Sequence, residues 1–453
     1  MSDHRPTHRV PERGELEIEV LGPLRYGSPL RSRGEGFVDE AERVLVPATE
    51  TELRPFLERG AAVPSFEPAG PRDRLFFDPT AITCGVVTCG GLCPGLNNVV
   101  RSIVRQLVYG YGVPRVLGFR YGYAGLAPRN GHAPIELTPQ IVDTLHEQGG
   151  TFLGSSRGPQ DIGEMVESLV RLGVRVLFVL GGDGGLRGAS AIAAEIRRRG
   201  LPIAVVGLPK TIDNDLRWTV RSFGFATAVE AARTVVQAAH VEATAAWNGI
   251  GLVKLMGRHA GFIAAHATLA SSDVNFCLIP ERPFTLDGEG GLLHALERRL
   301  AAKHHAVIVV AEGAGQNLLR EGPEEYDASG NLKLKDVGVF LRDAILRHFA
   351  AIGTPVTVRY FDPSYSIRSL PANSLDAQFC LMLGQHAVHA GMAGRTDLVV
   401  GSWSGRFVHV PTRLVTEERR QLDPEGEEWQ RVLDTTGQDT LMGSPAATTA
   451  SMA

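Results

Sequence analysis

The chain has 453 residues, of which 43% are hydrophobic and 21% charged, with a formal net charge of -4. This length exceeds that of a usual single core and predicts two lobes, while the composition excludes a fibre or a largely disordered chain. A negative balance gives no overall attraction to nucleic acid or to an anionic membrane, so an anionic substrate must be met by a local cluster of basic residues.

Residues 1–80 are rich in proline, arginine and glutamate, with a weak strand pattern at Leu16 to Leu21. We expect them to form an extension packed on the main body. The first residues are charged throughout and lack the apolar core of a signal peptide. The sequence contains no run of about 18 apolar residues, which is the length that a membrane span needs. The pattern predicts a cytoplasmic protein that binds neither membrane nor nucleic acid.

Five cysteines, an odd number in a long chain, argue against a disulfide framework and for a reducing compartment. Cys84, Cys89 and Cys93 lie close together, but their spacing matches no common zinc pattern. We expect these three to be small buried side chains rather than metal ligands.

From Ala81 onward, short apolar runs alternate with segments of helical period. This alternation predicts an α/β fold of the doubly wound type, in which helices cover parallel sheets. Helical spacing is clearest at 99–107 and 229–239. The predicted strands are Ile82 to Thr88, Val174 to Leu180, Ile203 to Leu208, Ile250 to Leu255, Phe276 to Ile279, Ala306 to Ala311, Val356 to Tyr360 and Leu398 to Val400. Such sheets bind ligands at the carboxyl ends of their strands, so the turns there are the places to search.

The first such turn, Cys89 to Asn98, is rich in glycine and leads into a helix. Glycines such as Gly90 let backbone N–H groups approach an anion, and the helix N-terminus adds partial positive charge. The Gly-Lys-Ser/Thr ending of a Walker loop is absent. Contact with a phosphate is the interpretation we favour, although many such turns are rich in glycine for steric reasons alone.

The second turn reads Gly181-Gly182-Asp183-Gly184-Gly185. A bare carboxylate would repel a polyphosphate, so we expect Asp183 to act through Mg²⁺, directly or by way of bound water. The alternative is an aspartate that only caps the following helix.

The third turn, Pro209 to Asp215, reads Pro-Lys-Thr-Ile-Asp-Asn-Asp. Asp213 is the candidate general base for an acceptor hydroxyl, with Thr211 and Asp215 fixing the geometry. Lys210 could neutralise charge on a transferring phosphoryl group. Taken alone, an Asp-Asn-Asp run is more often a simple turn, but the lysine and the preceding strand favour phosphoryl transfer.

Further along the chain, arginines follow predicted strands or lie in glycine turns. Arg157, Arg258 and Arg368 are suited to forked recognition of phosphate, although each alone is by default a surface residue. Glu312 could accept hydrogen bonds from substrate hydroxyls or cap a helix. The histidines 259, 304 and 305 have no ligand partner at a convincing spacing, and we interpret them as structural.

These motifs, in this order, resemble the 6-phosphofructokinase family, in its plant-like and protist-like ATP-dependent branch with a long N-terminal extension. The resemblance covers roughly Ala81 to Pro411. It includes the stretches Thr151 to Gly158, Leu252 to Arg258 and Ala311 to Gly315.

The resemblance implies a phosphofructokinase-like fold, with two Rossmann-like lobes, parallel sheets and an active-site cleft between the lobes. Residues 81–224 plus about 376–411 would form the ATP-binding lobe, and 225–375 the sugar-phosphate-binding lobe. Residues 1–80 would be an N-terminal extension and 412–453 a C-terminal extension, with a disordered tail from about Gly437.

The implied reaction transfers a phosphoryl group from ATP, with Mg²⁺, to the 1-hydroxyl of fructose 6-phosphate in glycolysis. The implied donor-site residues are Gly90, Arg157, Gly158, Gly182, Asp183, Gly184 and Gly185, with Asp183 at the metal. The implied sugar-phosphate residues are Thr211, Ile212, Asp213, Met256, Gly257, Arg258, Glu312, Tyr365 and Arg368. The catalytic residues would be Asp213 as base, Lys210 and Thr211. A homodimer or homotetramer with shared sites is implied, as is allosteric control, although no motif locates an effector site.

The phosphoryl donor is the finer question. Pyrophosphate-dependent members typically carry a second aspartate where this chain has Gly184, which favours ATP. Lys210 resembles the lysine of pyrophosphate users, yet the plant-like ATP branch combines this lysine with the glycine. Gly185 replaces the usual Ser or Thr and removes a hydroxyl that could bind phosphate. Gly249 stands where short bacterial enzymes have a substrate-binding arginine, a loss shared by the plant-like relatives.

Three alternatives remain open. The first is the pyrophosphate-dependent reaction, which runs readily in reverse. The second is a lipid or NAD kinase, which shares a Gly-Gly-Asp-Gly turn but has no reason to contain Pro209 to Asp215. The third is a regulatory paralogue with weak turnover, against which the presence of both Asp183 and Asp213 argues.

Overall fold

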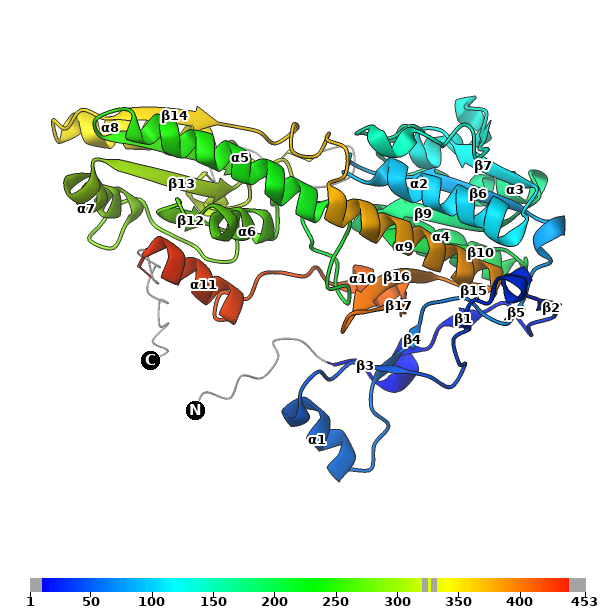
Figure 1. Ribbon diagram of the computed structural model, residues 1–453. Helices are drawn as coiled ribbons and strands as arrows, with labels where there is room; N and C mark the ends of the chain where they lie inside the picture. The colour runs from blue at the N-terminus through cyan, green and yellow to red at the C-terminus, as the bar shows by residue number, and fades with distance from the viewer. Residues whose placement is uncertain (1–9, 320–324, 327–331, 440–453) are drawn as a thin grey trace, which may run out of the picture. The chain divides into compact units, whose positions relative to one another are not determined.

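The computed structural model describes residues 10–319, 325–326 and 332–439, and Figure 1 shows the course of the chain. The density of internal contacts divides it into two units. Unit 1 consists of the chain up to Thr211, Leu216–Phe223 and Pro371–Glu418, and unit 2 of Ile212–Asp215, Gly224–Leu370 and the chain from Arg419. Most of the tail predicted to be disordered, from residue 440, lies outside the described residues.

Unit 1 is built on a nine-stranded sheet. In spatial order its strands are β3 (Val44–Leu45), β4 (Ser65–Pro68), β17 (Arg406–Pro411), β16 (Leu398–Trp403), β10 (Ala204–Pro209), β9 (Val174–Gly181), β6 (Thr83–Thr88), β7 (Arg115–Phe119) and β8 (Ile135–Glu136). The five strands from β16 to β7 are parallel, and antiparallel strands close both edges. The predicted strands 82–88, 174–180, 203–208 and 398–400 are confirmed within a few residues, whereas the sequence did not predict β7, β8 or β17.

Alternate side chains of β9 face two different helical layers. Leu177 and Val179 belong to an apolar cluster with α3 (Ile162–Arg171) and α4 (Asp183–Arg198). On the other side, a Cβ added at Gly391 of α9 (Ser374–Met392) would lie 2.5 Å from Val176, so α9 packs directly on the sheet. Beside α9 runs α2 (Leu96–Arg105), which continues as a π-helix at Gln106–Tyr111 (Figure 1). Successive side chains of a strand point to opposite faces of the sheet, so β9 packs against helices on both faces, as the predicted doubly wound fold requires.

The N-terminal extension packs on unit 1 through very short strands. β1 (Glu19–Val20) pairs with β15 (Arg395–Thr396), β2 (Tyr26–Gly27) pairs with β5 (Arg74–Leu75), and β3 and β4 extend the main sheet. The only helix of more than five residues in its described part, residues 10–80, is α1 (Glu50–Glu58). The predicted strand at Leu16 to Leu21 is wrong in extent, because Leu16 ends a 3₁₀ helix and only two residues join a ladder. Such strands depend on distant partners and leave little local pattern.

Unit 2 is built on a four-stranded parallel sheet in the order β12 (Phe276–Leu278), β13 (His305–Ala311), β11 (Gly249–Leu255) and β14 (Thr357–Phe361). All four strands were predicted. One face packs against α7 (Leu292–Lys303) and α8 (Val337–Ala351), and the other contacts α5 (Phe225–Thr244) and α6 (Phe262–Ser271). A Cβ at Gly251 would lie 2.6 Å from the carbonyl oxygen of Ala239, so glycine in β11 lets α5 approach the strand closely.

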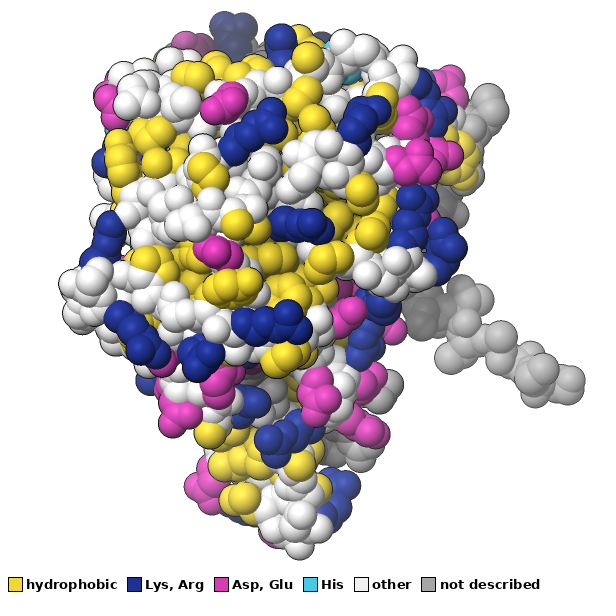
Figure 2. All heavy atoms as spheres, turned by 90° about the vertical axis from the view of Figure 1, so that its right-hand side faces the viewer, with side chains coloured by type: hydrophobic (Ala, Val, Ile, Leu, Met, Phe, Trp, Pro, Cys, Tyr) yellow, Lys and Arg dark blue, Asp and Glu magenta, His cyan; other side chains and the backbone are white. Residues whose placement is uncertain are grey.

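The C-terminal part of the chain divides between the units. The helix α10 (Thr412–Glu417) packs on α4 in unit 1, and α11 (Glu427–Thr436) packs on α6 in unit 2. Among the described residues, no helix is both long and apolar enough to cross a bilayer. On the face drawn in Figure 2, lysine and arginine side chains are dispersed among apolar and acidic ones and form no continuous basic patch.

Candidate active site

Three turns begin close together in unit 1, at the carboxyl ends of β6, β9 and β10. The backbone N–H of Cys89 donates to the carbonyl of Leu180 at 2.8 Å, which joins the first turn to β9. The N–H of Lys210 donates to the carbonyl of Gly181 at 3.0 Å, and its Nζ donates to the carbonyl of Gly91 at 2.9 Å. Lys210 is 5% exposed. The three turns are therefore one connected structure, as the parallel strand order requires.

Two helices begin at these turns. α2 starts after Gly95, whose φ of 96° lies in the left-handed region that favours glycine, and a Cβ there would meet the Cys380 sulfur at 2.6 Å. α4 starts at Asp183, after the cap residue Gly182. Helix N-termini carry unpaired N–H groups and partial positive charge, so this edge of unit 1 can bind phosphate groups.

Asp183 is the first residue of α4 and not its cap, so the capping interpretation of this aspartate is wrong. Its side chain is 17% exposed and forms an ion pair with Arg187, one turn along the helix, at 2.9 Å. The described residues hold no cluster of three or more metal-binding side chains. One carboxylate beside helix N-termini nevertheless fits Mg²⁺, which keeps several waters and takes its other ligands from the phosphates of a substrate.

The glycines after Asp183 differ in the space around them. A Cβ at Gly184 would meet nothing within 4 Å, and the residue is exposed. A Cβ at Gly185 would lie 3.1 Å from the Cβ of Cys89, which is tight. In this chain, Cys89 therefore leaves little room for a serine or threonine side chain at position 185.

Arg157 and Gly158 follow a segment that is fastened to the first turn. Ser155 donates its hydroxyl to the carbonyl of Gly90 at 2.5 Å, and Thr88 donates to the carbonyl of Gly154 at 2.7 Å. Gly158 has a φ of 96° and Arg157 is exposed. The structure thus brings all the predicted donor-site residues onto one edge of unit 1 or into segments bonded to it.

Within the motif Pro209 to Asp215 the chain first enters unit 2, and it returns to unit 1 at Leu216–Phe223. Lys210 and Thr211 belong to unit 1, where the carbonyl of Thr211 accepts a hydrogen bond from the Ser222 hydroxyl at 2.7 Å. Ile212 to Asp215 belong to unit 2, where the carbonyl of Asp215 accepts the N–H of Arg420 at 2.9 Å. Asp213 is partly buried, and the next residue, Asn214, has a φ of 54°.

In unit 2, six of the nine predicted sugar-phosphate residues follow the three neighbouring strands β13, β11 and β14. The N–H of Glu312 donates to the carbonyl of Leu255 at 2.9 Å, and that of Gly313 to the carbonyl of Gly257 at 3.1 Å, so the turns after β13 and β11 are joined. Met256 and Arg258 flank Gly257, whose φ is 133°. The Nη1 of Arg258 donates to the carbonyl of Leu332 at 2.6 Å.

The loop after β14 supplies Tyr365 and Arg368. The guanidinium carbon of Arg368 lies 4.8 Å from the centroid of the Tyr365 ring, and Tyr365 is 74% exposed. The Nε of Arg368 is buried and has no hydrogen-bond partner among the residues that the structure describes. A buried donor without a partner is unusual in folded proteins and suits a residue that awaits an anionic ligand.

The basic side chains of this edge interact electrostatically with Glu312. Burial raises the pKa of Glu312 above its ordinary 4.5, although the nearby charges of Arg258, Lys254 and Arg368 act in the opposite direction. These three cations therefore lie near the carboxyl group of Glu312. This edge of unit 2 combines positive charge with a hydrogen-bond acceptor, which is what recognition of a phosphorylated sugar requires.

Gly249, at the start of β11, has no room for a side chain. A Cβ there would lie 2.1 Å from the carbonyl oxygen of Ala243 in α5. An arginine at this position is incompatible with the packing of this chain.

Sequence reasoning missed two residues that the structure places beside the predicted ones. Tyr123 donates its hydroxyl to the carbonyl of Gly185, and its ring packs where a Cβ at Gly188 would be, 2.5 Å away. Lys254 forms two ion pairs near Glu312. Tyr123 lies in the turn after β7, a strand that the sequence did not predict. Lys254 lies inside a predicted strand, where no sequence pattern indicates a functional role.

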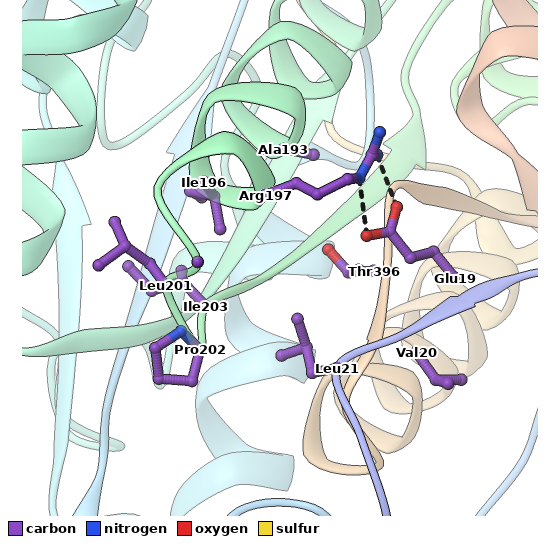
Figure 3. A pocket seen from close by; sticks show the side chains of 11 residues that line it. Glu19, Val20, Leu21, Ala193, Ile196, Arg197, Leu201, Pro202, Ile203 and Thr396 are labelled. Carbon is purple, nitrogen blue, oxygen red and sulfur yellow. Dashed lines mark hydrogen bonds and ion pairs between the residues drawn. The ribbon is translucent and has the colours of Figure 1, made fainter.

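A cavity of about 250 Å³ lies elsewhere in unit 1 (Figure 3). It is lined by the end of α4, by β1 and by the residues before β10, at the edge where the parallel strands begin. Arg197 spans it to Glu19, with its Nε donating to Oε1 at 2.8 Å (Figure 3). The glycine turns lie at the opposite ends of the strands, so this cavity is separate from the candidate site.

The three clustered cysteines, Cys84, Cys89 and Cys93, are buried, as predicted. Burial raises the pKa of the Cys89 thiol to about 12, with Lys210 opposing the shift.

Comparisons with known proteins point to one family. The family model described as Phosphofructokinase matches residues 83–391. An ATP-dependent 6-phosphofructokinase of Amycolatopsis methanolica is 50% identical, over 96% of this chain and 97% of its own length. Relatives of the same name from Borreliella burgdorferi and Trypanosoma brucei brucei are each 45% identical, covering 94% and 96% of this chain and 98% and 89% of their own lengths.

Solved structures share the fold at low sequence identity. The pyrophosphate-dependent phosphofructokinase of Marinobacter aquaeolei has a TM-score of 0.65 at 20% identity, over 80% of this chain and 92% of that one. The match of the family model over most of the chain and the close relatives along nearly its whole length lead to one conclusion: the chain belongs to the phosphofructokinase family.

Proposed function

We propose that the protein is an ATP-dependent 6-phosphofructokinase, which phosphorylates the 1-hydroxyl of fructose 6-phosphate in glycolysis. The observation that carries this proposal is the identity of 45% to 50% with relatives of that name along nearly their whole length. The turns of unit 1 would bind the phosphoryl donor, and the basic edge of unit 2 would bind the phosphorylated sugar that accepts the phosphoryl group.

ATP is proposed as the donor because of Gly184. An aspartate there would add charge and bulk beside the nucleotide phosphates, whereas glycine leaves the position open, with nothing within 4 Å of where a Cβ would be. The helix N-termini of α2 and α4 and the arginine of the Thr151 to Gly158 segment would bind the phosphate chain.

Asp183 would hold Mg²⁺ together with the phosphates of ATP, and the ion would neutralise charge on the transferring group. Binding would compete with the ion pair to Arg187, whose side chain is 56% exposed and free to turn into solvent.

Asp213 would act as the general base. Its carboxylate takes the proton of the 1-hydroxyl as that oxygen bonds to the γ-phosphorus, and the bond from phosphorus to the β–γ bridging oxygen breaks to leave ADP. Lys210, held at the turns of unit 1, would offset negative charge on the phosphoryl group, and Thr211 would help to fix the approach of the hydroxyl.

Unit 2 would bind the acceptor. Arg258 and Arg368 would contact the 6-phosphate, Glu312 would accept hydrogen bonds from sugar hydroxyls, and Tyr365 would cover the site beside Arg368. Met256, Gly257 and Ile212 would shape the backbone around the sugar.

We further propose that the enzyme acts in the cytoplasm as a homodimer or homotetramer. Five unbridged cysteines support a reducing compartment. Exposed apolar side chains on α9, namely Leu375, Leu381 and Met382, support a contact with another copy. Sedimentation of the purified protein tests the assembly, and a monomer at micromolar concentration would contradict it.

The reaction itself is tested by incubating the protein with fructose 6-phosphate, ATP and Mg²⁺ and following the mixture by ³¹P NMR. We expect ADP and fructose 1,6-bisphosphate to appear in equal amounts. ADP formed without a sugar bisphosphate would mean that the protein hydrolyses ATP and does not phosphorylate the sugar. No turnover with either ATP or pyrophosphate would favour the regulatory paralogue.

A further inference from the structure

Lys254 occupies an unusual place for a lysine. It is the sixth residue of β11, lies opposite Val310 of β13 and is 9% exposed. Its Nζ lies 3.0 Å from Oδ2 of Asp336 and 2.9 Å from Oδ2 of Asp362. A lysine is rarely buried unless paired, and here one ammonium group is shared by two carboxylates.

Asp336 and Asp362 hold different parts of unit 2. Asp336 is the cap of α8, where its Oδ1 accepts the N–H of Val339 at 3.1 Å and the hydroxyl of Tyr360 at 3.2 Å. Asp362 directly follows β14, and its Oδ1 accepts both the N–H and the hydroxyl of Ser364, at 3.2 and 2.5 Å. Lys254 therefore joins β11 to a helix start on one side and to a loop on the other.

That loop continues to the proposed sugar-phosphate residues through a chain of local hydrogen bonds. The N–H of Ile367 donates to the carbonyl of Pro363 at 3.1 Å, and the hydroxyl of Ser369 donates to the carbonyl of Tyr365 at 2.7 Å. Residues 362–369 thus form a compact turn whose first residue is held by Lys254 and which carries Arg368. On the strand side, Arg258 follows Lys254 by four residues.

We propose that Lys254 is a positioning residue for the acceptor, which fixes the loop of Arg368 against the end of β11 without touching the sugar phosphate. This inference rests on the proposed function. The ammonium group anchors Asp362, Asp362 anchors the turn, and the turn presents Arg368 beside Arg258. A guanidinium displaced by about 1 Å loses much of its forked recognition of phosphate.

The charges of the cluster are stable at neutral pH. Burial lowers the pKa of Lys254, but Asp362 and Asp336 outweigh it and hold that pKa above its ordinary value. Burial likewise raises the pKa of Asp362, but the hydrogen bonds from Ser364 and Lys254 hold it below its ordinary value. The anchor therefore does not switch with pH in the neutral range.

The two aspartates offer a matched pair of variants. Asp362→Asn weakens the link between Lys254 and the loop, whereas Asp336→Asn weakens the link to α8 and keeps a good capping residue. We expect Asp362→Asn to raise KM for fructose 6-phosphate by about tenfold or more, with KM for ATP little changed. Asp336→Asn should leave KM for fructose 6-phosphate near that of the wild type, even if its Tm falls.

Lys254→Met should resemble Asp362→Asn in KM. As a stability control, Arg395→Met removes a cation of similar burial from unit 1, where it pairs with Glu67, and should lower Tm without changing KM for fructose 6-phosphate. Equal effects of the two aspartate variants on KM, or no effect of Asp362→Asn in a folded enzyme, would overturn the inference. Wild-type protein that neither phosphorylates nor binds fructose 6-phosphate, measured by calorimetry, would instead reject the proposed function and this inference with it.

Discussion

At the scale of single residues, the proposal assigns the proton transfer to Asp213. Asp213→Asn has nearly the same shape, so the fold should persist while the base is lost. We expect kcat to fall by about 10²–10⁴-fold, because general-base catalysis contributes that much. Binding of fructose 6-phosphate, measured by calorimetry, should change little, since a base acts mainly in the transition state. Turnover close to that of the wild type would remove Asp213 from this role.

The donor preference depends on Gly184. Gly184→Asp places a carboxylate in open space at the second position of α4, where acidic residues suit the helix dipole, so Tm should hold. We expect kcat/KM for ATP to fall by about 10²-fold, because like charges brought together cost several kcal/mol. Gly184→Asn is the matched control that adds the same bulk without charge, and its loss should be clearly smaller. Equal losses in both variants would mean that bulk, not charge, decides the donor.

The stability of unit 2 should depend on the ionisation of Glu312. Its pKa is raised, mainly by burial, so between 4.5 and the raised value the folded state binds more protons than the unfolded state. Stability therefore falls as pH rises through that range, and the ionised carboxylate remains a cost above it. Glu312→Gln should unfold at a higher Tm than the wild type at pH 7, with the difference closing below pH 4.5. A lower Tm for the variant at pH 7 would contradict this reasoning.

At the scale of elements, the approach of α5 to β11 depends on glycine. A Cβ at Gly251 would lie 2.6 Å from a backbone oxygen of α5, and backbone cannot give way as a flexible side chain can. Gly251→Ala should destabilise the protein by about 1–3 kcal/mol, the usual cost of overpacking. Gly27→Ala, in a strand with nothing within 4 Å, should leave thermal unfolding almost unchanged. If both variants melt alike, the glycine at 251 is not required by packing.

The elements that the sequence predicted share a local signal. β6, β9, β10, β11 and β13 are short, mostly apolar runs that are buried on both faces, so composition alone reveals them. β7 was missed because Gly118 and the preceding Pro114 and Arg115 break its apolar run. β1 consists of two residues paired to β15, more than 370 positions away, and no local pattern specifies such a pairing.

The candidate site was predictable where residue type alone carries the chemistry. Glycine turns after strands, Asp183, Asp213 and the arginines stood out for that reason. Tyr123 and Lys254 did not, because their roles depend on partners distant in sequence, the carbonyl of Gly185 and the carboxylates of Asp336 and Asp362. A tyrosine after an unpredicted strand and a lysine inside an apolar run look like ordinary surface and strand residues.

At the scale of the whole molecule, the chain first enters unit 2 within the motif Pro209 to Asp215. Lys210 and Thr211 belong to the unit with the donor turns, and Asp213 to the unit with the acceptor residues. The lobe boundaries and the site residues inferred from the sequence stay predictions. Family membership follows from the comparisons, and the choice of ATP as phosphoryl donor is supported both by the relatives named ATP-dependent 6-phosphofructokinase and by Gly184.

The choice of ATP over pyrophosphate can be tested by measuring the selectivity of the enzyme for its phosphoryl donor. The measurement is kcat/KM for ATP and for pyrophosphate in the wild-type enzyme, at saturating fructose 6-phosphate and Mg²⁺. We expect a ratio that favours ATP by about 10²-fold or more, the effect ascribed to a single charge at the position of Gly184. A ratio that favours pyrophosphate would contradict it and would make Lys210, rather than Gly184, the residue that marks the donor.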